Sequence, residues 1–124
     1  MKEARALLEA SCYEGAYYLA GYAAECALKA CIAKQTARHE FPEKEWAIAC
    51  YTHKLSELAK LAGLDKALKA AEHTHPELIW NWNLVRNWSE ASRYERPSSA
   101  DAEELVKALE ERKHGVLRWL RRYW

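Results

Sequence analysis

The stretch CYEGAYYLAGYAAECALKACIAK, residues 12–34, decides the fold of this chain. Residues 15–24 carry no charge, and Ala, Leu, Cys and Tyr dominate, so the stretch predicts a helix that is apolar on most of its circumference. Neighbours normally enclose such a helix on several sides, which predicts the central helix of a bundle. Glu14, Glu25 and Lys29 interrupt the run before it reaches the roughly twenty apolar residues that span a bilayer.

The composition predicts one ordinary globular domain covering residues 1–124. Of the 124 residues, 50% are hydrophobic and 30% are charged, which suits a single core. Lysine plus arginine total 19 and aspartate plus glutamate total 18, so the formal net charge is +1. Overall charge therefore gives no argument for a nucleic-acid partner, and any such case depends on local patches. Four glycines and three prolines leave few turns and favour an all-α fold.

The cysteines indicate a reducing compartment. No CxxC pair occurs among them, and the sequence shows no signal peptide, so we expect a cytoplasmic protein with reduced thiols buried as small apolar groups. Cys26 and Cys31 lie five residues apart on one predicted helix, about 140° around its axis, and cannot bond to each other. The four cysteines are Cys12, Cys26, Cys31 and Cys50.

The spacing of apolar residues predicts a series of helices. Thr74, with Glu77 three residues later, predicts a capping box before one of them, and Ser98 or Ser99 is the predicted cap of the last. The expected architecture is an antiparallel four-helix bundle with additional short helices. The predicted helices cover about 2–10, 13–36, 53–61, 64–72, 76–91 and 98–124, with a loop at 37–52.

A polar stripe is the first candidate site. Asn83, Arg86, Asn87 and Glu90 have the spacing i, i+3, i+4 and i+7, which places them on one face of the predicted 76–91 helix. Arginine can bind phosphate or carboxylate with two hydrogen bonds, and asparagine can hydrogen-bond a base edge or an amide. The stripe is thus a candidate binding surface. A solvated helix face or a polar seam between two subunits explains the same pattern.

Glu25 and Lys29 form the second candidate site. They lie four residues apart in the acid-first order that favours an ion pair on a helix, and Tyr22 shares their side. A buried carboxylate needs such a partner because burying an unpaired charge is very costly. The pair either fixes the register of the helix or lines a ligand pocket facing Arg93 or Arg86.

The remaining polar residues give weaker signals. His73 and His75 could supply two metal ligands, but zinc sites need three or four, so we expect no metal and no cofactor. The C-terminal segment is locally basic and contains three aromatic residues, a combination that suits either a helix C-terminus or RNA binding. Its members are Lys113, Arg118, Arg121 and Arg122 with Trp119, Tyr123 and Trp124.

Three segments resemble HEPN domains, the helical nucleotide-binding domains of higher eukaryotes and prokaryotes. YYLAGYAAE at residues 17–25, followed by ALKA at 27–30, looks like the second helix of that family. THKLSEL at 52–58 is similar to its short H-x-L-x-x-L helix, and Ser92-Arg93-Tyr94 is similar to the Arg-Tyr that ends its fourth helix. The resemblance implies a small, all-helical, prokaryotic domain.

The resemblance also bears on catalysis. Many HEPN domains are metal-independent RNases, with an arginine beside a polar residue and a histidine four to six intervening residues later. Arg86-Asn87 resembles the first half, but the histidine positions hold Ala91, Ser92 and Arg93. Serine has no pKa near neutrality and cannot replace imidazole as a general acid or base. The chain therefore looks like a non-catalytic member.

Partners are predicted partly from the tryptophans. Trp80, Trp82 and Trp88 lie on different sides of one predicted helix, and an aromatic left outside the core commonly marks an interface. Together with the resemblance, this predicts a homodimer.

The resemblance further implies a nucleotide or RNA ligand, or a nucleotidyltransferase partner in a toxin–antitoxin-like system. The alternatives are a diverged RNase built on Arg86, Asn87 and Tyr94, and a purely structural interaction module. The binding candidates are Asn83, Arg86, Asn87, Glu90, Arg93 and Tyr94.

Overall fold

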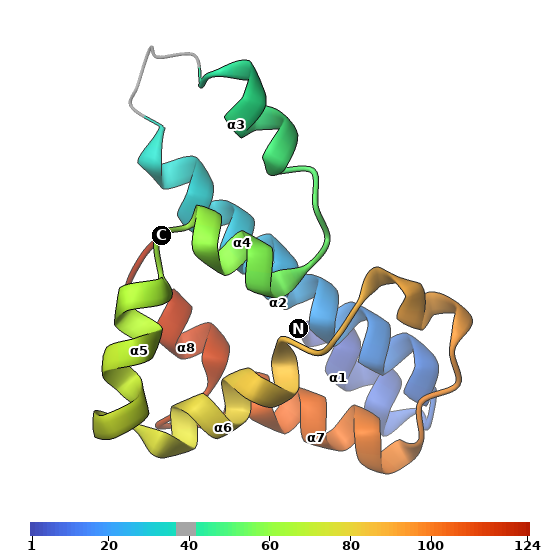
Figure 1. The fold of residues 1–124 in the computed structure, drawn as a ribbon. Coiled ribbons are helices and arrows are strands. Elements are labelled where there is room, and N and C mark those ends of the chain that lie inside the picture. Colours follow the sequence, from blue (N-terminus) through green and yellow to red (C-terminus); the bar gives the residue numbers. More distant parts are fainter. Residues whose placement is uncertain (37–41) are drawn as a thin grey trace.

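The computed structural model describes residues 1–36 and 42–124, and within these ranges the fold is all-helical, as predicted (Figure 1). The first half contains α1 (Lys2–Glu9), α2 (Tyr13–Gln35), α3 (Lys44–Ala49) and α4 (Leu55–Leu61). The second half contains α5 (Asp65–Thr74), α6 (Pro76–Val85), the 3-10 helix η1 (Glu90–Tyr94), α7 (Ser99–Glu110) and α8 (Val116–Leu120).

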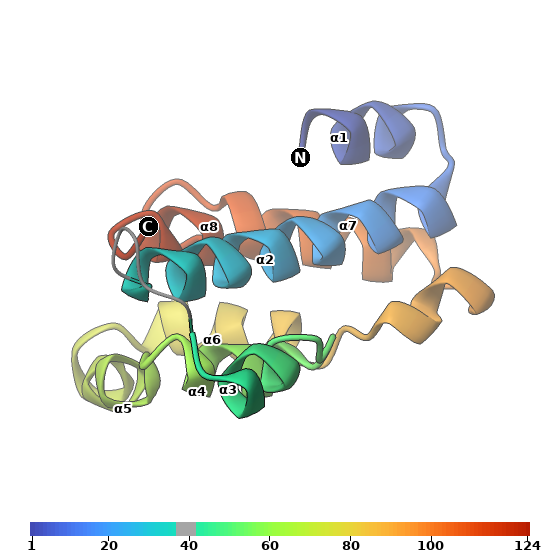
Figure 2. The ribbon, with the colours of Figure 1, turned by 90° about the horizontal axis from the view of Figure 1, so that it is seen from above.

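Helix α2 is the centre of the molecule, as its apolar sequence predicts. It contacts α1, α4, α7, α8 and η1, and in Figure 2 it runs along the length of the fold with α1 on one side and α4 and α5 on the other. Small residues let these neighbours approach closely, because an alanine holds them off by only one methyl group. The buried residues of α2 are Ala16, Ala20, Gly21, Ala24, Glu25, Ala27, Leu28, Cys31 and Ile32.

Another segment of the chain approaches α2 closely at Gly21. The indole of Trp88 lies directly over it, and a Cβ placed on Gly21 would overlap the ring. Trp88 is buried, and its ring also lies 6.1 Å from the Tyr18 ring, centroid to centroid. A glycine is therefore required at position 21, and the contact joins the end of the α6 segment to the middle of α2.

Two long predicted helices are broken, the first at a contact with a distant segment and the second at a local turn. The predicted 76–91 helix ends at Val85, and the chain leaves helical geometry before Trp88, which packs on Gly21 of α2; Ser89, after it, is extended. The predicted 98–124 helix ends at Glu110. There the Glu111 carboxylate accepts backbone N–H bonds from Lys113 and His114, which stabilises a turn before Gly115 starts α8.

Other local predictions have mixed outcomes. The loop predicted at 37–52 contains α3, although no residue of α3 is buried, and the part of that loop at 37–41 lies outside the described residues. The Thr74–Glu77 capping box is wrong, because the Thr74 hydroxyl bonds the Ala70 carbonyl inside α5. The Ser98 cap is confirmed and forms a full capping box with Asp101.

Candidate functional site

Arg86 lines a polar pocket of about 260 Å³ between α4, α5 and α6. Lys60 of α4 and Lys69 of α5 line the same pocket, and Asn83 lies one helical turn before Arg86. In the described part of the chain, no carboxylate lies within 4.0 Å of the Arg86 guanidinium. The acidic residues that line the pocket are Asp65 and Glu72.

The polar stripe predicted from the sequence is therefore divided into two parts. Asn83 and Arg86 line the pocket, whereas Asn87 is an exposed turn residue after the helix has ended. Glu90 belongs to η1 and points toward another site altogether. The prediction of one continuous face is wrong because it assumed that α6 extends to residue 91.

Glu90 belongs to a chain of charged side chains that links α2 to η1. The Glu25 carboxylate is only 2% exposed and lies 2.9 Å from Lys29 Nζ and 3.0 Å from His53 Nδ1. His53 Nε2 lies 3.3 Å from Glu90, and Arg93 lies 3.0 Å from the other oxygen of Glu90. This chain of contacts connects α2, His53 two residues before α4, and η1.

The predicted Glu25–Lys29 pair is confirmed, and the structure adds His53 to it. The sequence places His53 at the start of a predicted helix and within the HEPN-like segment 52–58, but does not indicate its contact with Glu25. A carboxylate faces each nitrogen of its ring, so a ring protonated at both nitrogens donates to Glu25 and Glu90 together. Tyr22 is not a member of this cluster, since it is 42% exposed, stacks on Tyr18 and lines a different groove.

Ser92 occupies one of the positions where the resemblance places a catalytic histidine. It is 1% exposed, and its hydroxyl has no hydrogen-bond partner in the described ranges. A group buried in this way does not reach a substrate at the surface. Arg93 and Tyr94, which follow it, are exposed, and the Arg93 guanidinium lies 4.9 Å from the centre of the Tyr94 ring.

The tryptophans of the α6 region point to different sides, as the sequence predicts. Trp82 and Trp88 are buried, whereas Trp80 is 76% exposed on the outer side of α6. Among the C-terminal aromatic residues, Trp119 is buried and only Trp124 is exposed. That segment therefore offers no row of aromatic rings for stacking with RNA bases.

The cysteines and histidines can also be compared with what the sequence predicts for them. Cys12 and Cys26 are exposed, contrary to the prediction of buried thiols, whereas Cys31 is buried and this burial raises the pKa of its thiol. Within residues 1–36 and 42–124, no three side chains of His, Cys, Asp or Glu come together as a metal site. His75 and His114 pack against each other with ring centroids 6.2 Å apart.

No protein-family model matches the chain, and neither does any curated protein or any solved structure. The resemblance to HEPN domains therefore depends on the quoted residues alone. Among the described helices, none combines the length and the apolar character needed to cross a bilayer.

Proposed function

We propose that this protein is a non-catalytic, cytoplasmic HEPN-type module that binds a nucleotide or short RNA at the Arg86 pocket. The observation that supports this best is the pocket itself, where Arg86 stands beside Lys60 and Lys69 with no carboxylate within 4.0 Å in the described residues. A phosphate group fits this environment because the guanidinium can donate two parallel hydrogen bonds to its oxygens.

The other groups of the pocket fit a nucleotide. The amide of Asn83 can donate to and accept from a base edge, and the exposed Asn87 is available to a longer ligand. A pocket of about 260 Å³ lies just below the range of drug-sized ligand sites and holds a single phosphate or part of a nucleotide. Asp65 and Glu72 in the same lining repel further negative charge, so the pocket holds one phosphate group and the rest of a longer ligand lies outside it.

The surroundings of Ser92 and His53 support a non-catalytic role. Ser92 is buried and lacks an acid–base group, so it does not take the part of the histidine in RNase members. Glu90 contacts both His53 and Arg93, but carboxylates face both nitrogens of the His53 ring. A general base needs one nitrogen free to accept a proton from the substrate.

Trp80 supports the second element of the proposal, a homodimer or a complex with a nucleotidyltransferase-type partner. A large aromatic ring that is 76% exposed is typical of the core of a protein interface. Tyr94, at 80% exposed, offers a second aromatic contact for such a partner. A toxin–antitoxin-like pair is the arrangement that the resemblance implies for this partner.

Thermal unfolding of the purified protein with a panel of nucleotides and short RNAs tests the proposal. A ligand at about 100 times its Kd adds about 2.7 kcal/mol to the free energy of unfolding, which raises Tm by several degrees. We expect this rise without RNA cleavage on gels, and its loss in Arg86→Ala. Lys107→Ala is the matched control, since Lys107 is an exposed cation of α7 outside the pocket. Light scattering on the same samples should give twice the 14.4 kDa of one chain.

Two results contradict the proposal. A Tm rise that survives Arg86→Ala places the ligand elsewhere on the molecule. RNA cleavage that disappears in Arg86→Ala identifies the protein as an RNase despite the missing histidine.

A further inference from the structure

A second site lies on the opposite side of α2, between α2, the C-terminal segment and α1. It consists of an apolar groove of about 640 Å³ and an adjoining pocket of about 360 Å³ lined by arginines. The two share Met1, Leu117 and Arg121, so they form one continuous depression. Neither contains a residue of the Arg86 pocket.

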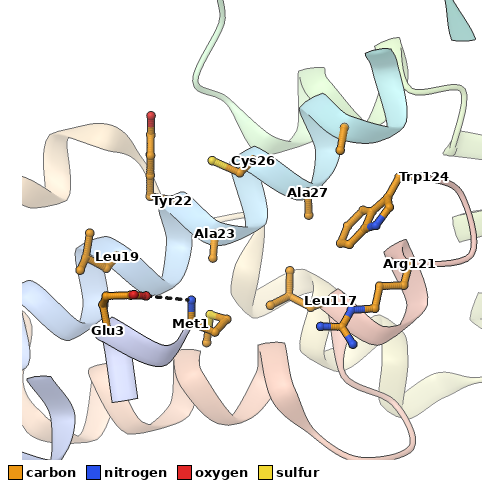
Figure 3. A pocket seen from close by; sticks show the side chains of 11 residues that line it. Met1, Glu3, Leu19, Tyr22, Ala23, Cys26, Ala27, Leu117, Arg121 and Trp124 are labelled. Carbon is orange, nitrogen blue, oxygen red and sulfur yellow. Dashed lines mark ion pairs between the residues drawn. The ribbon is translucent and has the colours of Figure 1, made fainter. Parts of the chain in front are cut away.

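The groove is long and apolar. On the α2 side its lining runs from Leu19 to Ala30, a rise of about 16 Å along the helix. Figure 3 shows Ala23 and Ala27 facing Leu117 and the Trp124 ring across the groove. The small alanine side chains leave the space open, and the groove lies within the usual size range of small-molecule sites.

The adjoining pocket is positively charged. Arg112, Arg118 and Arg121 line it, and none has a carboxylate within 4.0 Å in the described part of the chain. The two acidic residues of the lining are already bonded. Glu110 pairs with Arg5 at 3.3 Å, and Glu111 accepts the backbone N–H bonds described above, which lower the pKa of its carboxyl.

The geometry points to a binding site for an amphiphile, that is, an elongated apolar molecule that ends in a carboxylate or a phosphate. The apolar part lies along α2 in the groove, and the anionic end is bound by Arg118 and Arg121. At the end of the groove away from Arg121, the Glu3 carboxylate pairs with the N-terminal ammonium at 3.9 Å, so the excess positive charge lies at the arginine end and favours one orientation of the ligand (Figure 3). This site is independent of the function proposed for the Arg86 pocket.

Isothermal titration calorimetry with dodecyl phosphate and with dodecanoate, each below its micelle concentration, tests this inference on the full chain. We expect binding of one or both, and their relative affinities identify the headgroup. An uncharged probe of the same chain length, dodecyl maltoside, should bind at least about tenfold more weakly, because it forms no charge-assisted hydrogen bonds with the arginines.

Two variants locate the site. Arg121→Gln removes the charge that the groove and the pocket share and should weaken dodecyl phosphate about tenfold or more. Ala23→Phe fills the groove from its half-buried position and should abolish binding, while circular dichroism confirms that the variant is folded. Arg86→Ala and Lys107→Gln should both bind as the parent protein does, which separates this site from the Arg86 pocket.

Three outcomes overturn the inference. Equal affinity for the charged and uncharged probes excludes recognition by the arginines. Unchanged binding in a folded Ala23→Phe places the ligand outside the groove. Binding only to anionic lipid vesicles, with no heat from the monomeric amphiphiles, indicates a charged surface instead of a site.

Discussion

At the scale of single residues, the contact of Gly21 with Trp88 leaves no room for a side chain at position 21. We expect Gly21→Ala to lower the free energy of unfolding by about 2 kcal/mol or more, because the new Cβ overlaps the buried indole. Gly15→Ala in the same helix is the matched control, since its Cβ meets only the flexible end of Leu7, at 3.0 Å. Alanine's better helix propensity, about 0.5–1 kcal/mol, should offset that contact. Urea denaturation of both variants measures the difference, and equal effects at the two positions contradict the packing described for Trp88.

Glu25 shows how far a sequence can predict a site at this scale. The partner Lys29 was predictable, because a spacing of four residues brings two side chains together on any helix. The partner His53 was not, since it is 28 residues away and meets Glu25 only after α4 has packed on α2. The contact of His53 with Glu90 depends on a further element, η1, that the sequence did not reveal.

At the scale of the helix, the start of α7 gives a prediction with a defined pH dependence. The hydroxyl and backbone N–H of Ser98 donate to the Asp101 carboxylate and hold its pKa below the ordinary value. A depressed pKa in the folded state contributes stability above the ordinary pKa of aspartate, about 4, and this stability is lost as the pH falls through the folded value.

Ser98→Ala should therefore cost about 1 kcal/mol at pH 7, the usual cost of losing an N-cap. The cost should become smaller toward pH 3 and lower, as the pH falls through the depressed pKa of the Asp101 carboxyl in the folded protein. It should not vanish, because the Ser98 hydroxyl also accepts the Asp101 backbone N–H. Thermal unfolding at both pH values measures this, with Ser99→Ala as the control. A cost that is the same at pH 7 and at pH 3 contradicts the assigned role of Asp101.

Helix boundaries were predictable only where a local signal sets them. Ser98 followed by Asp101 is such a signal, and the apolar run of α2 gave that helix within two residues at each end. The end of α6 at Val85 has no such signal, because the chain turns there so that Trp88 can reach Gly21, a contact between distant segments. The predicted polar stripe was divided for this reason, and the Arg86 pocket contains only two of its four members.

At the scale of the whole molecule, the all-helical fold around α2 follows from composition and from one apolar segment. The two pockets cannot be predicted from the composition or from that apolar segment. The Arg86 pocket needs α4 and α5 beside α6, and the amphiphile groove needs the C-terminal segment beside α2. Each pocket brings together residues that are far apart in the sequence. The sequence alone therefore does not predict which side chains line it.

The central claim is that a nucleotide or short RNA binds at the Arg86 pocket without being cleaved. Backbone amide chemical shifts, followed by NMR during titration with the best ligand from the thermal panel, test it most directly. The claim predicts that the largest shifts cluster at Lys60, Lys69, Asn83 and Arg86, that Arg118 and Arg121 stay unchanged, and that the ligand spectrum remains that of intact material. Shifts confined to other surfaces, or new signals from a cleaved ligand, would contradict it.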